Sequence, residues 1–96
     1  MATSTIKNTN VKVKSFTFDN LAQYTASGYY VTVPNFKTKA GIPSGSIIVA
    51  LTLTGWSGLG TNPNLGFSGA GALWVFFTNG TTLTSSSYAV VNIAYI

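Results

Sequence analysis

The last ten residues of the chain, SYAVVNIAYI, are apolar on both sides of a predicted strand. With the two-residue period of a strand, the odd-numbered residues from Ala89 to Tyr95 share one face and the even-numbered residues from Tyr88 to Ile96 share the other. Apart from Asn92, neither face carries a strongly polar residue. A strand with one solvated face alternates apolar and polar residues. The pattern therefore predicts that the second face is also covered.

The segments LWVFF and SIIVALTLTGW are also predicted strands. In LWVFF, Leu73, Val75 and Phe77 lie on one side and Trp74 and Phe76 on the other, so both faces are again apolar. In SIIVALTLTGW, the odd-numbered aliphatic residues from 47 to 53 share one face and the threonines lie on the other. This second segment is therefore expected to turn its odd-numbered face towards the core.

Shorter strands separated by turns are predicted elsewhere. In VKVKSFTF, apolar and polar residues alternate, but the apolar residues move from odd to even positions after Val13. We therefore expect a bulge or a break near Ser15. YYVTV ends at Pro34, and a brief strand is expected around residues 65–67. The pair Asn79-Gly80 fits a tight hairpin turn, but we favour a wide loop that lets LWVFF pair directly with the terminal strand.

The spacing of these segments predicts an all-β domain. About six to eight short strands, with turns every 8 to 12 residues or so, are typical of an antiparallel β-sandwich or a small barrel, and we favour a knob-like sandwich. We expect residues 11–96 to form this single sandwich domain. Residues 1–10 are polar and unpatterned, and we interpret them as a linker or the end of a stalk.

Composition and charge exclude several functions. The chain has five lysines, one aspartate and no histidine or cysteine, which leaves no pair of groups for acid–base or nucleophilic catalysis. The same shortage of ligands argues against a metal site, and we expect no enzyme activity and no cofactor. Only 6% of the residues are charged, against about a quarter in typical domains, so part of the surface is expected to be covered by a partner.

The second apolar faces predict an oligomer interface. We expect a closed homotrimer, in which neighbouring copies bury the outward side chains of the late strands. The alternative is that loops of the same chain cover them. The predicted interface residues are Trp74, Phe76, Tyr88, Val90 and Ile96.

These features together resemble a known family. A neutral domain rich in Gly, Ser, Thr and Asn, with SIIVALTLTGW in its middle and the terminus VVNIAYI, is similar to the C-terminal head domains of bacteriophage tail fibres and receptor-binding proteins. The resemblance spans about residues 16–96. It implies a trimeric β-sandwich at the tip of a virion fibre, extracellular at the host surface, whose loops bind a host polysaccharide or protein.

Aromatic and amide side chains are the candidate receptor contacts. Sugar sites combine aromatic rings with hydrogen-bonding groups, and we assign this role to Trp56, Asn62, Asn64 and Tyr29. Trp56 could equally close the end of the core, and the two asparagines could serve the turn around Pro63 alone. Phe67 is expected in the core. In a strand, Tyr29 and its neighbour point to opposite faces, so at most one is expected to contact a receptor.

Two other functions remain open. A structural virion subunit, such as a decoration or connector protein, would use the same interface without a receptor. Binding of single-stranded nucleic acid is less favoured, because the lysines form only two clusters and arginine is absent. We interpret Lys37 and Lys39 as guards of an exposed strand edge. Neither a signal peptide nor a membrane helix is predicted, so no membrane insertion is expected.

Overall fold

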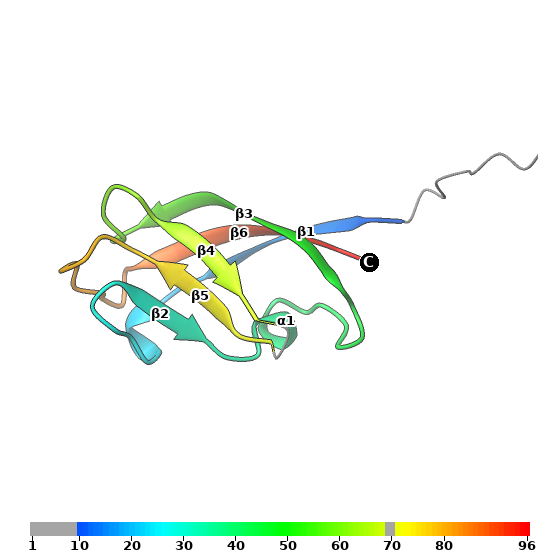
Figure 1. The fold of residues 1–96 in the computed structure, drawn as a ribbon, viewed down its shortest axis with the longest axis horizontal. Helices are drawn as coiled ribbons and strands as arrows, with labels where there is room; N and C mark the ends of the chain where they lie inside the picture. Colours follow the sequence, from blue (N-terminus) through cyan, green and yellow to red (C-terminus); the bar gives the residue numbers. More distant parts are fainter. Residues whose placement is uncertain (1–9, 69–70) are drawn as a thin grey trace, which may run out of the picture.

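The structure is a computed structural model that describes residues 10–68 and 71–96, and these form two three-stranded antiparallel sheets (Figure 1). Sheet A has the order β1 (Lys12–Phe18), β6 (Tyr88–Tyr95), β3 (Ile48–Ser57). Sheet B has the order β2 (Tyr30–Val33), β5 (Leu73–Phe76), β4 (Asn64–Phe67). The connections contain a short 3-10 helix, η1 (Leu21–Gln23), and one helical turn, α1 (Phe36–Lys39). The all-β prediction is confirmed.

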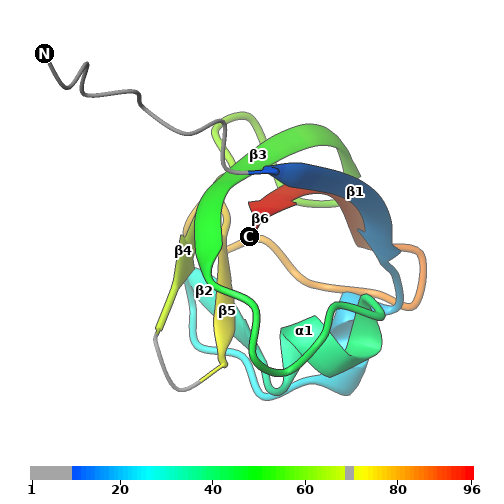
Figure 2. The same cartoon turned by 90° about the vertical axis from the view of Figure 1, so that its right-hand side faces the viewer.

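Both sheets contribute side chains to one hydrophobic core. On the central strands, the inward residues Leu73, Val75, Ala89, Val91 and Ile93 are all 0% exposed, as the alternation predicted. Figure 2 shows the two sheets along two sides of the molecule and the segment with α1 along a third. The core is therefore enclosed by both sheets together with the connection from β2 to β3.

Strand β1 is continuous, so the predicted bulge or break near Ser15 is wrong. Its register with β6 is regular from Lys12 opposite Tyr95 to Phe18 opposite Ala89. The apolar residues move from odd to even positions along β1 because the first half of the strand is apolar on its outer face and the second half on its inner face. Phe18 is buried in the core, whereas Val13 lies on the outer face.

Strand β3 contains bulges, and because of them the residues that face the core differ from those predicted. The register with β6 shifts between Ile48 and Ala50, so Val49 is an extra residue. An extra residue reverses the alternation of a strand. Ile47 and Val49 are consequently exposed, and Ile48 packs against the core on the same face as Leu51.

The predicted pairing of LWVFF with the terminal strand is also wrong. Strand β5 pairs with β2 and β4, and the connection of residues 77–87 crosses to the other sheet. Within it, the amide of Thr81 donates to the carbonyl of Thr78 at 3.0 Å, and Gly80 has a φ of 89°. Asn79 does not have positive φ, so the turn is of type II and not the type I′ turn of a tight hairpin.

The connections separate the molecule into two ends. Three of them, residues 19–29, 58–63 and 77–87, lie together at what we call the loop end, on the left in Figure 1. Residue 10 and Ile96 lie towards the opposite end, which we call the terminal end and which also carries α1. No helix in the described part of the chain is long and apolar enough to cross a membrane.

Candidate binding site

The outward-facing residues of sheet B form two rows across the strands. In the first row Phe76 lies between Tyr30 on β2 and Asn64 on β4. In the second row Trp74 has Gly66 as its partner on β4. Residues directly opposite in an antiparallel sheet share a face. Each row therefore has an aromatic ring on the central strand and a polar or small residue on the edge strand β4.

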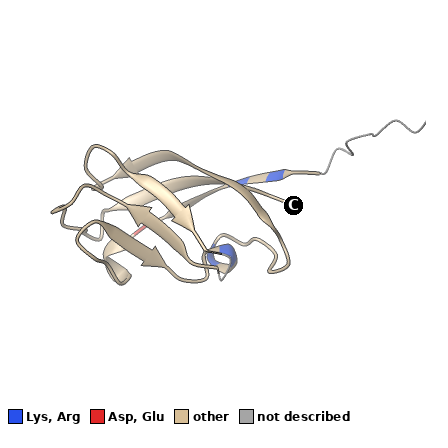
Figure 3. Ribbon diagram, in the orientation of Figure 1, with Lys and Arg blue, Asp and Glu red and all other residues tan. Residues whose placement is uncertain are grey.

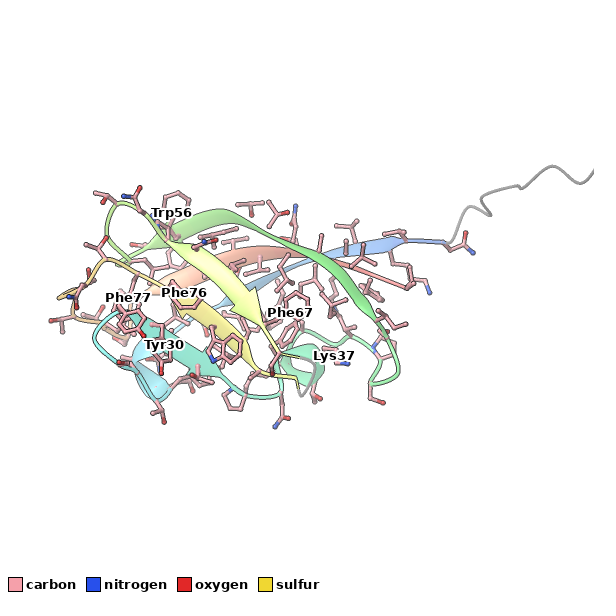
Figure 4. The ribbon with its side chains drawn as sticks, in the orientation of Figure 1. Tyr30, Lys37, Trp56, Phe67, Phe76 and Phe77 are labelled. Carbon is pink, nitrogen blue, oxygen red and sulfur yellow. The ribbon has the colours of Figure 1, made fainter. Side chains whose placement is uncertain are left out.

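Four aromatic side chains line a depression on this face. We call it the aromatic depression. It is shallow and open to solvent, has a volume of about 310 Å³, and is lined by Tyr29, Tyr30, Trp74 and Phe76. The ring centroids of Tyr29 and Tyr30 are 4.9 Å apart in an edge-on arrangement, and those of Tyr30 and Phe76 are 5.9 Å apart. The Tyr29 and Phe76 rings are stacked at 6.4 Å. Figure 4 shows Tyr30 and Phe76 together on sheet B near the loop end.

Tyr29 joins this cluster because it precedes strand β2. The amide of Ser27 donates to the carbonyl of Tyr30 at 2.8 Å, so Gly28 and Tyr29 form the tip of a tight turn. A residue in a turn does not follow the alternation of a strand. The expectation that at most one of Tyr29 and Tyr30 faces outward is therefore wrong, and both rings line the same depression.

Gly66 leaves room for the two central rings. A Cβ atom at this position would lie 3.2 Å from Cε2 of Phe76 and 3.4 Å from Cε3 of Trp74. Both distances are tighter than ordinary carbon–carbon contacts of about 3.5–4.0 Å. The absence of a side chain on Gly66 thus allows the rings to extend over the edge strand.

Hydrogen-bonding groups flank the rings. Asn64 and Thr32 are on the outward face in the rows of Phe76 and Trp74, respectively. The Oδ1 atom of Asn64 accepts a hydrogen bond from the amide of Leu65 at 2.8 Å, which fixes the side chain, and its amide nitrogen carries two N–H donors. A neutral ligand with both apolar faces and hydroxyl groups therefore finds partners for each.

The charged residues that the structure describes lie away from the aromatic depression. Lys12 and Lys14 are on β1, Lys37 and Lys39 are in α1, and Asp19 follows β1 (Figure 3). None of them lines the depression. Proteins that bind single-stranded nucleic acid combine stacking rings with cationic side chains in one groove, and the described residues do not show that combination.

The lysines of α1 have contacts within the protein. Lys37 Nζ donates to the carbonyls of Ser44 and Ser46, at 3.2 Å each, and Lys39 Nζ lies 5.5 Å from the centroid of the Tyr24 ring. Both lysines belong to a helical turn and not to a strand, and the interpretation of the pair as guards of a strand edge stays a prediction.

A second cavity lies beside α1. It has a volume of about 250 Å³, and its lining includes Phe36, Lys37, Ile48 and Phe67. Phe67 is 41% exposed and its ring lies 6.4 Å from that of Phe36, so the expectation that Phe67 belongs to the core is wrong. Since Lys37 already donates to two carbonyls, this cavity is a weaker candidate site than the aromatic depression.

Hydrogen bonds between loops hold the loop end together. The amide of Phe77 donates to the carbonyl of Tyr29 at 2.9 Å, which ties the turn carrying Tyr29 to the end of β5. The amide of Thr78 donates to the carbonyl of Leu59, and Thr78 Oγ1 accepts from the amide of Thr61 at 3.1 Å. The three loops therefore support one another around the depression.

The predicted receptor contacts separate into two groups. Tyr29 lines the depression and Asn64 flanks it. Trp56 lies on β3 in the other sheet, 44% exposed, and Asn62 is exposed in the connection that follows β3. Figure 4 shows Trp56 at the loop end, apart from Tyr30 and Phe76. All four are near the loop end, but only two belong to the same surface.

The predicted interface residues also divide. Trp74 and Phe76 are half-buried on the outer face of sheet B, where they line the depression. Tyr88, Val90 and Ile96 lie on the outer face of sheet A, with Tyr88 37% and Ile96 42% exposed. These two faces look in different directions. A single flat interface could not contain all five side chains.

The aromatic depression is a candidate binding surface. Within residues 10–68 and 71–96, no group of three or more His, Cys, Asp or Glu side chains could hold a metal ion. The aromatic depression offers stacking faces, an amide and hydroxyl groups without a formal charge. Comparison with protein-family models, curated proteins and solved structures gives no significant match. The function is therefore inferred from the geometry and from the resemblance noted in the sequence.

Proposed function

We propose that this domain is the receptor-binding head of a bacteriophage tail fibre. In this proposal it folds as a β-sandwich, forms a homotrimer at the tip of the fibre, and binds a neutral saccharide on the host surface without catalysis. The aromatic depression is the binding site. The location is the virion, extracellular at the host surface.

The observation that carries the proposal is the uncharged aromatic depression beside Asn64 and Thr32. A pyranose ring has apolar C–H faces and polar hydroxyl edges. The faces can stack on Trp74 and Phe76, while the amide of Asn64 and the tyrosine hydroxyls can bond to the edges. No cationic side chain lines the depression and could pair with an anionic sugar. The proposed ligand is therefore a neutral saccharide.

The placement of the site supports the same function. The depression lies on sheet B near the loop end, where Figure 4 shows Tyr30 and Phe76, whereas β1 begins near the terminal end (Figure 1). If residues 1–10 continue a stalk, the loop end points away from the stalk and towards a host cell. The hydrogen bonds between the loops then keep the aromatic rings in place before a ligand binds, which lowers the entropic cost of binding.

The test is binding of neutral cell-wall oligosaccharides to the purified chain, measured by calorimetry. We expect Trp74→Ala to weaken binding at least tenfold, because one aromatic stacking face is lost. Trp56→Ala is the matched control, since it removes the same type of side chain from the loop end of sheet A. Thermal unfolding of both variants establishes that they are folded.

The outcomes separate the candidate sites and functions. Loss of binding in Trp56→Ala alone would move the site to the loop end of β3, around Trp56. Absence of binding by the folded wild-type chain, and of its attachment to host cells, would favour a structural virion subunit. The exposed aliphatic residues of the terminal end are compatible with that second function, because they suit assembly whether or not a receptor is bound.

A further inference from the structure

Exposed aliphatic side chains gather at the terminal end of sheet A. We call this group the apolar patch, and it consists of Val11, Val13, Ile47, Val49 and Ile96, which are 48%, 65%, 63%, 53% and 42% exposed, respectively. The patch is distinct from the aromatic depression, which lies on the other sheet.

The five side chains come from all three strands or their direct extensions. Ile47 and Ile96 exchange two backbone hydrogen bonds, of 2.9 and 3.0 Å, so they lie directly opposite each other. Val13 lies opposite Ala94 on β6, and Val11 is two residues earlier, on the same face. Val49 is the bulged residue of β3. The bulge is therefore what adds a second β3 side chain to the outer face.

The outer face between them carries small, uncharged side chains. Ala50 lies opposite Ala94, so small side chains occupy the middle of the patch. Lys12 and Lys14 are opposite Tyr95 and Ile93 and hence lie on the inward face of β1. No lysine side chain of β1 therefore interrupts the patch.

The patch is large enough to serve as an interaction surface. Five large aliphatic side chains that are roughly half exposed present a few hundred Å², and the largest apolar patch of a typical monomer, about 300–600 Å², is often functional. Residues 1–9, MATSTIKNT, contain only Met1 and Ile6 as large apolar residues and could not match five aliphatic side chains. A charged partner would find no complementary charge. An equally apolar, uncharged surface matches the patch best, and a second copy of the chain presents one.

We infer that the apolar patch is where copies of this chain pack against one another around a common axis. This inference rests on the homotrimer of the proposed function and specifies its interface. Towards the loop end, the outer face of sheet A continues with Ser15, Asn92 and Thr52 in one row, and with Thr17 and Val90 in the next. Polar residues therefore border the patch on this side, and an interface that includes them could approach the typical burial of about 800 Å² on each partner.

This arrangement changes the role of the predicted interface residues. Ile96 is in the patch, and Val90 and Tyr88 follow on the same face of β6. Trp74 and Phe76 turn away from the axis with sheet B, so the aromatic depression of each copy stays open to saccharide. The terminal ends of the copies come together, as a shared stalk requires.

The experiment measures the mass of the full chain in solution by sedimentation at tens of micromolar. We expect a trimer of 10.1 kDa chains for the wild type and a monomer for the double variant Val13→Glu, Ile47→Glu. Both positions are more than half exposed in one chain, so the fold tolerates the glutamates, whereas an interface would bring the like charges of three copies together. The control Tyr29→Glu adds a negative charge in the turn before β2, away from the patch, and should remain trimeric.

Each result is decisive. A monomeric wild type, or a double variant that stays trimeric, would overturn the inference. Should the double variant unfold, Val13→Ser with Ile47→Ser replaces it, and an unchanged trimer dissociation constant would count equally against the patch. Saccharide binding is measured on the same samples. If the wild type is a monomer that still binds saccharide, the interface is wrong and the receptor-binding part of the proposed function holds. If it is a trimer that binds no saccharide, the receptor-binding part is wrong and the interface holds.

Discussion

Gly66 lies directly opposite Trp74 in the register of β4 and β5, and a Cβ atom there would lie 3.4 Å from Cε3 of the indole. On the side of the edge strand β4, the Trp74 ring is thus bordered by a residue that has no side chain. Because the same Cβ would be 3.2 Å from Phe76, both central rings depend on this glycine for their positions.

We therefore predict that Gly66→Ala alters binding more than stability. The rings must move by a few tenths of an ångström, which changes the spacing of the two stacking surfaces. Saccharide affinity should fall several-fold, while the free energy of unfolding changes by less than about 1.5 kcal/mol, as for small overpacking at a partly open site. Calorimetric titration and urea unfolding measure the two effects. Equal affinities for variant and wild type would show that the ligand does not contact both rings.

Gly60→Ala should destabilise the loop end. Gly60 has a φ of 80°, and a Cβ atom would lie 2.5 Å from Cβ of Thr78. The left-handed conformation alone costs about 1 kcal/mol for alanine, and the clash adds to it, so we expect a loss of about 2–4 kcal/mol in the free energy of unfolding.

The matched control for this variant is Gly80→Ala. Gly80 has a φ of 89°, but a Cβ atom there would have no other atom within 4 Å, so only the conformational cost of about 1 kcal/mol applies. Urea unfolding of both variants gives the difference. Equal losses would mean that contact between Gly60 and Thr78 does not hold the two loops together.

Leu59→Ala should be among the most damaging substitutions outside the strands. Leu59 is 0% exposed although it lies in the connection between β3 and β4, and its carbonyl accepts the amide of Thr78. Truncation of a buried leucine typically costs about 2–5 kcal/mol, through lost burial and the remaining cavity. A change below about 1 kcal/mol in urea unfolding would show that this loop is not anchored in the core.

Stability should decrease at alkaline pH through Tyr24. Burial raises the pKa of the Tyr24 hydroxyl, and the negative charge of Asp19 raises it further. The folded state then retains the proton at a pH where the unfolded state has lost it. Stability from this group is complete below the unfolded pKa of about 10 and is lost as the pH rises through the higher folded pKa.

Tyr24→Phe is the direct check on this pH dependence. The variant lacks the ionisable group, so its free energy of unfolding should fall less than that of the wild type between about pH 9 and pH 11. Asp19→Asn should reduce the same difference in part. Parallel curves for the wild type and Tyr24→Phe would contradict the assignment.

Local pattern was sufficient for the central strands of this protein. In β5 and β6, the residues predicted on one face, such as Val75 and Val91, are fully buried, because a regular strand between two neighbours keeps its two-residue period. The brief strand expected around residues 65–67 is β4 (Asn64–Phe67), and β2 ends before Pro34 as expected. Tyr29 and Asn64 were identified as candidate contacts from residue type alone, and both lie at the aromatic depression.

The remaining features depend on pairing between distant segments. Whether Val49 faces the core follows from a bulge against β6, and whether β5 pairs with β6 follows from which strands are joined across the sheets. Tyr29 and Tyr30 share one surface because a turn interrupts the strand between Ser27 and β2. Alternation along a chain specifies two faces of a strand but not what lies opposite each face. For this reason the amino-acid pattern indicated which strands were apolar on both faces. Only the three-dimensional arrangement distributed their apolar residues among a core, an aromatic depression and an apolar patch.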